Sequence, residues 1–310
     1  MTLPPAVRVA PTLDQGWVEV TACPICGTRE SRPFETIEKG TERVSFRLCS
    51  SCGAVYQSPR MSDEALENYY VSDYLLHHQR ADGITEKELW VQAGRARHLI
   101  RLMHGQVGTV RRHLDVGSST GKLMQAVVSA YGCESVGIEP MEVYRDHCTA
   151  EGLRVYPELK ALAKADEPRF DLITMTHVLE HLLDPIQFTE DLRLRWLLPE
   201  GALVVEVPNL FGHLNLERPH LLCFHSATLR RALAAAGFET KRVVHHGFPR
   251  SRIIPLYLTT IARPGAGPAL GRVRSTARGV ELRRALGMAW HRIATKLLPF
   301  WAWLPLPEME

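Results

Sequence analysis

Four cysteines near the amino terminus have the residue type and the spacing of metal ligands. They stand as two CxxC pairs in "CPICGT" and "CSSCGAVY", at Cys23, Cys26, Cys49 and Cys52. Four thiolates complete the tetrahedral coordination of a structural zinc ion and leave no position for a catalytic water. A glycine follows each pair, which lets the backbone turn so that its amides point at the thiolates. We predict structural zinc here, in preference to a redox dithiol or chance spacing.

A turn of small residues follows the first strand-like run of the central part. The stretch "HLDVGSSTGKLMQAV", which starts at His113, passes through this turn directly into a helix-like pattern. Small residues let a chain pass close beneath a ligand, and a helix start offers amide donors to it. A dinucleotide and S-adenosylmethionine compete for such a turn, but the dinucleotide fingerprint GxGxxG does not fit, because Ser119 stands at its second glycine position. The candidate residues are Asp115, Gly117, Ser118, Ser119, Thr120 and Gly121.

Glu139 ends the next predicted strand, in "SVGIE". A carboxylate at the end of the second strand of such a unit can accept hydrogen bonds from both hydroxyls of a ribose. The alternative is a solvated side chain at a strand end. The turn and the carboxylate together favour the ribose, and therefore a nucleoside-containing ligand.

Histidines follow the fourth predicted strand, where a general base would be useful. His177 and His181 flank Glu180 in "THVLEH", and the carboxyl ends of parallel strands face the binding crevice. Histidine is the natural base near neutral pH. On a helical turn the two histidines would share a face at a spacing that also binds metal, but a third ligand is not evident. Shaping of the site, a structural role and metal binding all stay open.

The loop after the fifth predicted strand holds the acceptor-side candidates Asn209, His220 and His225. His220 could be the base, could position a substrate or could be a loop histidine, and the sequence does not rank it against His181. Other histidines and cysteines are expected to be structural, as strand or surface histidines and as small buried thiols: His245, His246, Cys133, Cys148 and Cys223.

Alternating strand-like and helix-like segments must hold these residues. From Val110 onward the short apolar runs "VRRHLDV", "SVGIE", "LRVYP", "FDLITM" and "GALVVEVPN" alternate with helical patterns, including one near Pro185 to Trp196. Such alternation predicts crossover units and a mostly parallel sheet. Two last strands, "ETKRVVHH" and "RIIPLYLTTIAR", joined by residues 247–251, predict an antiparallel pair. The expected fold class is α/β, with a doubly wound, mostly parallel, seven-stranded sheet.

Composition divides the chain into four parts. We expect a zinc-ribbon module at 1–60, a helical linker at 61–108, the ligand-binding domain at 109–263 and a basic and apolar helical tail at 264–310. The tail is interpreted either as a helix that docks on the domain or on a second subunit, or as an amphipathic segment that seeks anionic lipid. Pro299 and Pro305 argue against a spanning helix.

Charge and composition indicate which binding partners and which cellular compartment to expect. A formal net charge of +3 is too small to imply a nucleic-acid partner. No secretory signal and no apolar run of spanning length is evident, and cysteines in knuckle spacing suit a reducing compartment. We therefore expect a cytoplasmic monomer or homodimer, with peripheral membrane contact through the tail as an option.

Together these motifs resemble class I S-adenosylmethionine-dependent methyltransferases. The family turn DxGxGxG stands here as "DVGSSTG", with Ser119 in place of the central glycine, and Glu139 matches the ribose acid. The stretches "FDLITMTHVLEHLLDP" and "LRWLLPEGALVVEVPN" resemble the fourth and fifth family strands, and "HLLCFHSATLRRALAAAGFE" is similar to the helix before strand six. The resemblance implies a Rossmann-like methyltransferase fold that binds S-adenosylmethionine.

The resemblance also implies roles for residues beyond the turn. Glu139 and Pro140 would lie at the ribose, Glu158 and Leu159 would contact adenine, and Thr176 and His177 would line the methionine end.

The amino-terminal part is similar to that of a subgroup. "CPICG", "CSSCGAVYQSP" and "LENYYVSDY" resemble the zinc module and linker of bacterial methyltransferases for sugars, glycans and secondary metabolites. The deoxysugar C-methyltransferases of that group have two histidines flanking a glutamate where only "RPHLLCF" stands here, which argues against carbon methylation of a keto-sugar. We predict O-methylation of a small molecule or glycan by in-line transfer, with His181, His220 or His177 at the reacting groups. Nitrogen, carbon or RNA acceptors, and a non-catalytic binding protein, are the alternatives.

Overall fold

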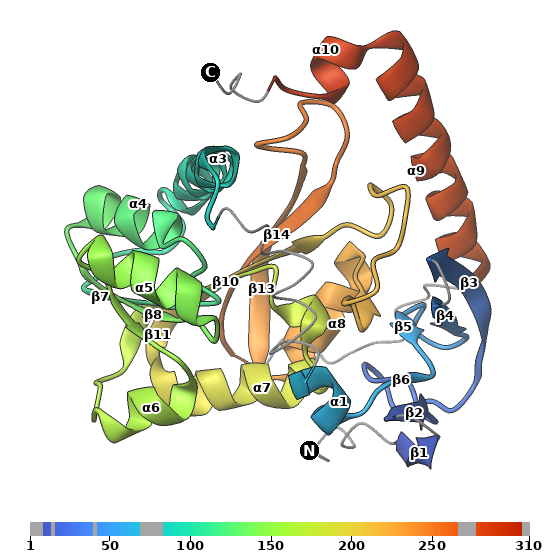
Figure 1. The fold of residues 1–310 in the computed structure, drawn as a ribbon, viewed down its shortest axis with the longest axis horizontal. Helices are drawn as coiled ribbons and strands as arrows, with labels where there is room; N and C mark the ends of the chain where they lie inside the picture. The colour runs from blue at the N-terminus through green and yellow to red at the C-terminus, as the bar shows by residue number, and fades with distance from the viewer. Residues whose placement is uncertain (1–8, 14–15, 40–41, 69–82, 266–276, 306–310) are drawn as a thin grey trace.

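A seven-stranded sheet forms the centre of the molecule (Figure 1). The structure is a computed structural model that describes residues 9–13, 16–39, 42–68, 83–265 and 277–305. The strand order is β13-β14-β11-β10-β7-β8-β9. All neighbours pair in parallel except β14, which is antiparallel to both β11 and β13. The bounds are β7 (Arg112–Val116), β8 (Glu134–Ile138), β9 (Arg154–Tyr156), β10 (Phe170–Thr176), β11 (Leu197–Pro208), β13 (Phe238–His246) and β14 (Tyr257–Pro264). The predicted α/β fold is confirmed.

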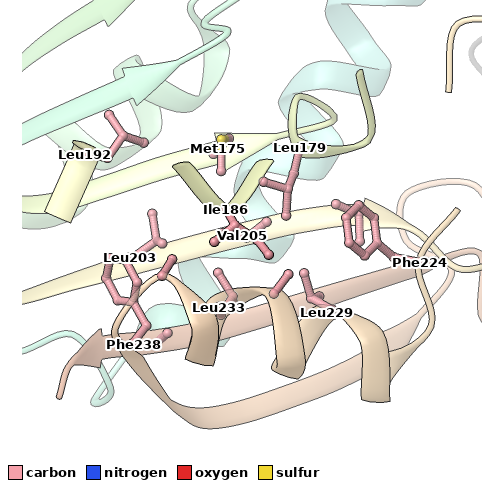
Figure 2. Packing of buried hydrophobic residues seen from close by; sticks show 14 of the residues in the cluster. Met175, Leu179, Ile186, Leu192, Leu203, Val205, Phe224, Leu229, Leu233 and Phe238 are labelled. Carbon is pink, nitrogen blue, oxygen red and sulfur yellow. The ribbon is translucent and has the colours of Figure 1, made fainter. Parts of the chain in front are cut away.

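Helices cover both faces of this sheet, which explains why its central strands are continuous apolar runs. In β11, Leu203 and Val205 pack with α7 (Pro185–Asp191) and α8 (Ser226–Ala235), whereas Ala202 and Val204 pack with α3 (Glu86–Met103) and α4 (Lys122–Tyr131). Figure 2 shows Leu229 and Leu233 of α8 directed at the strand that carries Val205. The remaining helical elements of this domain are α5 (Glu142–Ala150), α6 (Leu159–Lys164), the 3₁₀ turn η2 (Leu179–His181) and the π-helical turn η3 (Leu192–Trp196).

The amino-terminal part folds as two small sheets. The first contains β1 (Val9–Leu13), β2 (Trp17–Val20) and β6 (Arg60–Met61), and it leads into the short helix α1 (Asp63–Asn68). The second contains β3 (Ser31–Lys39), β4 (Glu42–Cys49), β5 (Val55–Gln57) and β12 (Leu222–Cys223). Because β12 comes from the loop after β11, one strand of the second sheet is supplied by the large domain. Three of the four CxxC cysteines, Cys23, Cys49 and Cys52, lie in the same hydrophobic core as the seven-stranded sheet. The fourth, Cys26, is partly buried and packs against that core.

Two predicted elements differ from the structure. The helix expected from Pro185 to Trp196 is an α-helix only to Asp191 and continues as a π-helical turn. The strand expected to start in "RIIPLY" begins only at Tyr257. Upstream of it, the hydroxyl of Ser251 accepts hydrogen bonds from the backbone N–H groups of Ile253 and Ile254, so this segment is a turn.

Most of the described carboxy-terminal residues are helical, as predicted. It contains α9 (Ala277–Leu297) and α10 (Pro299–Ala302), and α9 lies along the outside of the molecule beside β3 (Figure 1). Among the described residues, no helix is long and apolar enough to cross a bilayer. Most of the predicted linker motif "LENYYVSDY" lies outside the described residues.

Candidate active site

A cleft of about 1490 Å³ opens at the carboxyl ends of β7, β8 and β10. Parallel sheets bind ligands at this edge, where the strand order reverses. Twelve sequence-predicted residues line the cleft: Asp115, Gly117, Ser118, Ser119, Thr120, Glu139, Pro140, Glu158, Leu159, Thr176, His177 and His181. Residues from four separate segments of the chain therefore meet in one cavity.

The turn between β7 and α4 has three residues in the left-handed backbone region. The φ angles are +77° at Gly117, +45° at Ser119 and +71° at Gly121. A Cβ on Gly117 would overlap with Cγ2 of Val178, which lies across the cleft floor. Gly121 precedes the first residue of α4 and does not line the cleft. The glycines therefore serve the tight path of the chain as well as access for a ligand.

Replacing Gly117 by alanine is expected to lower the free energy of unfolding by about 3 kcal/mol, since it combines left-handed strain with a clash in a packed region. Gly132→Ala is the matched control. Its φ is also positive, at +63°, but a Cβ there meets nothing within 4 Å. We expect the control to cost about 1 kcal/mol. Urea unfolding of both variants measures the difference, and equal losses would show that the Val178 contact is unimportant.

Glu139 holds the turn against the end of β8. One carboxylate oxygen accepts a hydrogen bond from the N–H of Ser119 at 2.8 Å, and the other accepts one from the N–H of Met141 at 2.9 Å. Burial raises the pKa of this carboxyl above its usual value, although the two N–H donors oppose that shift. Each oxygen keeps a further lone pair. The carboxylate is thus fixed at the cleft wall and can still accept from a ligand.

A chain of buried hydrogen bonds fixes Asp115 on the opposite side of the turn. Thr174 donates its hydroxyl hydrogen to Oδ1 of Asp115 at 2.6 Å, so the Thr174 oxygen must accept from Nε2 of His113 at 2.7 Å. The other ring nitrogen of His113 then accepts from Ser135 at 2.8 Å. Burial raises the pKa of Asp115 to about 7 and lowers that of His113 to about 3. This chain spans three neighbouring strands and makes the Asp115 side chain rigid.

His177 bridges two buried carboxylates at the floor of the cleft. Its Nδ1 lies 3.3 Å from Glu180 and its Nε2 lies 3.4 Å from Glu206. Burial and the Arg95 guanidinium lower the pKa of His177, but the two carboxylates outweigh them and raise it overall. The φ of His177 is +55°, so the residue is not part of a helical turn with His181 as the sequence suggested. The backbone N–H instead donates to the carbonyl of Glu206 at 2.9 Å.

His181 and His220 form a neutral pair beside this bridge. Their rings meet edge to face at 4.9 Å. Nδ1 of His181 donates to the carbonyl oxygen of Pro219 at 2.9 Å, which leaves the lone pair of the neutral ring on Nε2. Burial lowers the pKa of each histidine to about 4. The ring nitrogens and a Glu180 oxygen lie within 4.8 Å of one another, so Glu180, His181 and His220 are residues that could hold a metal ion.

Two predicted acceptor-side residues are committed to backbone contacts away from the cleft. Nδ2 of Asn209 donates to Pro255 O at 2.8 Å, while its Oδ1 accepts from Phe211 N at 3.2 Å. The His225 ring bonds Gly53 O at 3.1 Å, which ties the second cysteine pair to the start of α8. His220 lines a separate cavity of about 20 Å³, which has room for little more than one water molecule. None of the three acceptor-side candidates lines the large cleft, whereas His177 and His181 both do.

Sequence reasoning missed the buried centre of this region, Glu206. Its carboxylate lies 2.9 Å from Arg95 and 3.3 Å from His246, and it accepts from Thr259 at 3.0 Å. His177, His246 and the Arg95 guanidinium hold the pKa of Glu206 well below the usual range, although full burial opposes that shift. His246, expected to be a strand or surface histidine, is a strand residue but is buried. A glutamate inside the apolar run "VVEVPN" was the available signal, because an unpaired charge is not tolerated there.

The four amino-terminal cysteines converge as predicted. Sγ of Cys23 lies 3.6 Å from that of Cys52, and Sγ of Cys26 lies 3.6 Å from that of Cys49. These separations exceed a disulfide bond of about 2.05 Å. They match the edges of about 3.8 Å in a tetrahedron with 2.3 Å Zn–S bonds. The thiols therefore fit zinc, and none of the four is joined in a disulfide.

Comparisons with known proteins agree with this geometry. A family model for methyltransferase domains matches residues 89–243, half of the chain. A ubiquinone biosynthesis O-methyltransferase from Methylococcus capsulatus is 37% identical over 82 residues, which cover 24% of this chain and 34% of that protein. The match thus spans about a third of the curated relative.

Solved methyltransferase structures are also similar to this chain in fold. A 1,6-didemethyltoxoflavin N1-methyltransferase from Burkholderia thailandensis aligns with a TM-score of 0.52 at 16% identity, over 76% of this chain and 99% of that one. An S-adenosylmethionine-dependent methyltransferase from Archaeoglobus fulgidus aligns with a TM-score of 0.46 at 19% identity, over 63% of this chain and 99% of that one. With the cleft at the carboxyl ends of the strands and a matching family model, the chain belongs to the methyltransferase domain family.

Proposed function

We propose that the protein is an S-adenosylmethionine-dependent methyltransferase that acts on a small molecule or glycan, with an oxygen atom as the acceptor. The observation that carries this proposal is the shared cleft, in which Glu139 and the turn at Gly117 face Thr176 and His177. By the names they carry, one relative above is an O-methyltransferase of ubiquinone biosynthesis and another is an N1-methyltransferase of 1,6-didemethyltoxoflavin. Those names support small-molecule acceptors as a class.

The cleft residues fit the cofactor in three places. Glu139 would offer oxygens to the ribose hydroxyls, while Glu158 and Leu159, which line the same cleft, would border the adenine. Small residues at Gly117 and Ser118 leave space for the chain beyond the ribose. When bound, S-adenosylmethionine supplies the methyl group as a sulfonium cation, and the buried carboxylates near His177 favour positive charge at this end of the cleft.

We assign the proton transfer to His181. Its pKa of about 4 keeps the ring neutral at neutral pH, and its Nδ1–H bond to Pro219 directs the lone pair onto Nε2. Nε2 would accept the proton of the acceptor hydroxyl as the new bond to the methyl carbon forms. His220 positions the ring of His181 from the side. The ring of His177 is held between the carboxylates of Glu180 and Glu206, and Asn209 and His225 support the structure.

Replacing His181 by alanine is expected to lower kcat about a hundredfold, because a positioned general base contributes at least that much. The Kd for S-adenosylhomocysteine should change little. His245→Ala is the control, since this histidine is exposed on β13. Steady-state kinetics with the best acceptor provide the measurement. An unchanged kcat would transfer the role to His220 or show that no base is required.

We also propose that the cysteine site holds structural zinc in a reducing, cytoplasmic setting, in a monomer or homodimer. The zinc-binding part directly contacts the loop that carries His220 and the segment after His181. Nε2 of Gln57, at the end of β5, donates to the carbonyl oxygens of Arg218 at 2.5 Å and His220 at 3.0 Å. Arg60 likewise donates to the carbonyl of Leu183 at 2.9 Å. Zinc would therefore fix the loop that carries His220, although it takes no part in the chemistry.

Calorimetry with S-adenosylhomocysteine, followed by methyl transfer to a panel of acceptors, tests the function. The panel should contain hydroxyl, amine and carbon nucleophiles, each in sugar and aromatic forms. We expect cofactor binding and turnover with a hydroxyl acceptor. Turnover with amines or carbon acids alone would replace the acceptor assignment. Absence of cofactor binding would refute the enzyme and favour a binding protein that retains only the fold.

A further inference from the structure

The outward side of α9 and α10 carries large apolar side chains. Among the described residues, eleven large hydrophobic side chains are exposed. Seven of them belong to these two helices and an eighth, Leu298, lies between the helices, with exposed fractions from 42% for Trp290 to 86% for Phe300. We call them the outer face of α9–α10: Leu282, Leu286, Trp290, Ile293, Leu297, Leu298, Phe300 and Trp301. So large an apolar patch on a folded surface is a sign of an interaction site.

The inner side of α9 is fixed to the protein, so the outer face has a defined orientation. Arg284 pairs with Glu35 of β3 at 2.9 Å and donates to the Leu210 carbonyl at 2.6 Å. Nδ1 of His291 donates to Gly212 O at 2.7 Å. A Cβ on Gly287 would overlap with the carbonyl of Phe211. α9 is therefore a docked helix along the edge of the molecule (Figure 1), and the apolar side chains on its other side point outward.

Cations border this apolar stripe on both sides. At about 100° per residue, Leu286, Ile293 and Leu297 fall on one line along the helix. Arg292 and Lys296 lie on one flank of that line, while Arg283 lies on the other; all three are exposed. The only acidic residue in the sequence from 277 to 305 is Glu281, and its carboxylate is paired with Arg32 at 2.6 Å.

The end of the stripe adds aromatic rings and two more cations. Phe300 and Trp301 of α10 are exposed, and the neighbouring loop presents Arg250 and Arg252. The Arg252 guanidinium stacks over the Trp301 ring at 5.4 Å. Exposed tryptophan beside arginine is typical of groups that sit at the boundary between lipid headgroups and acyl chains.

A second copy of this chain or a membrane surface could cover such a face, and the charge around it distinguishes the two. A second copy packed through the same face would bring arginines and lysines of both helices together without acidic partners. An anionic bilayer offers apolar depth to the stripe and negative charge to both flanks. No described helix can span a bilayer, so the contact would be parallel to the surface. We propose that the outer face of α9–α10 docks the protein on the surface of an anionic lipid membrane.

Vesicle flotation of the full-length protein tests the docking. The probes are phosphatidylcholine vesicles with and without phosphatidylglycerol. We expect binding to the anionic vesicles, and weakening by salt. The double variant Leu286→Glu, Ile293→Glu should lower the bound-to-free ratio at least about tenfold, because it places charge where the stripe would enter the lipid. Leu194→Glu is the matched control, with the same change at a side chain that is 50% exposed on η3, and should bind as before.

A second variant addresses charge without altering the stripe. Arg292→Glu with Lys296→Glu should reduce binding to the anionic vesicles roughly tenfold or more, since each cation near such a surface contributes about 1 kcal/mol. Light scattering in the absence of lipid shows the oligomeric state, and circular dichroism shows that each variant is folded. Absence of vesicle binding would overturn the proposal. An equal loss of vesicle binding in Leu194→Glu would also overturn it. So would a wild-type dimer that Leu286→Glu, Ile293→Glu dissociates, if vesicles bind neither the dimer nor the monomer.

Discussion

Replacing Cys49 by serine is expected to release zinc and unfold the amino-terminal sheets, with loss of methyl transfer. Structural zinc contributes roughly 10 kcal/mol or more to the folding of small modules. The Cys49 thiol is buried and lies 3.6 Å from that of Cys26, so a serine oxygen would leave an incomplete site within the core. Metal analysis by mass spectrometry should show one zinc per wild-type chain and none in the variant. Limited proteolysis should then cut within residues 1–60.

Cys133→Ser is the control for this prediction. Cys133 is also buried, but it lies at the end of α4, far from the cysteine site in the sequence, and its nearest polar contact is the Val127 carbonyl at 3.9 Å. It should retain zinc, fold and activity. A Cys49→Ser protein that loses zinc but keeps full resistance to proteolysis would show that the metal does not stabilise this part of the protein.

The second large effect is expected at Glu139. Its replacement by alanine should raise the Kd for S-adenosylhomocysteine about a thousandfold, because hydrogen bonds to a charged group contribute about 1.5–3 kcal/mol each and a ribose would lose two. The change also removes the acceptor for Ser119 N–H and Met141 N–H, so the turn loses its support. Isothermal titration calorimetry measures the affinity, and thermal unfolding shows how much of the loss comes from stability.

Glu134→Ala provides the matched control, since this residue begins the same strand and its carboxylate is largely exposed. Its cofactor affinity should equal that of the unmodified protein. If Glu139→Ala binds the cofactor normally while remaining folded, the ribose does not lie at the end of β8, and the proposed cofactor orientation is wrong.

The sequence predicted the fold well because its signals are local. Short apolar runs that alternate with amphipathic helices report the parallel strands, and the turn at Gly117 and the acid at Glu139 follow single strands directly. The cysteine pairs likewise carry their spacing within a few residues. Each of these features depends on neighbours along the chain, so the residue pattern suffices to predict it.

The parts that were missed depend on contacts between distant segments. Glu206 is paired with Arg95 from α3 and His246 from β13, and no local pattern links these three residues. Asn209 and His225 looked available to bind an acceptor. In the structure, the side chain of Asn209 is hydrogen-bonded to the Pro255 carbonyl and that of His225 to the Gly53 carbonyl. β12 has two residues, too few for any periodicity, so its pairing with β5 could not be foreseen.

That pairing of β12 with β5 has a consequence for synthesis on the ribosome. The cysteine-bearing sheet emerges first, but the strand that covers its edge is translated only after most of the large domain. Until then the edge of β5 that later pairs with β12 has unpaired backbone N–H and C=O groups, which can pair with a strand of another chain. Early capture of zinc would hold the nascent sheet in shape during this interval, so metal starvation should cause aggregation of newly made chains before it harms mature ones.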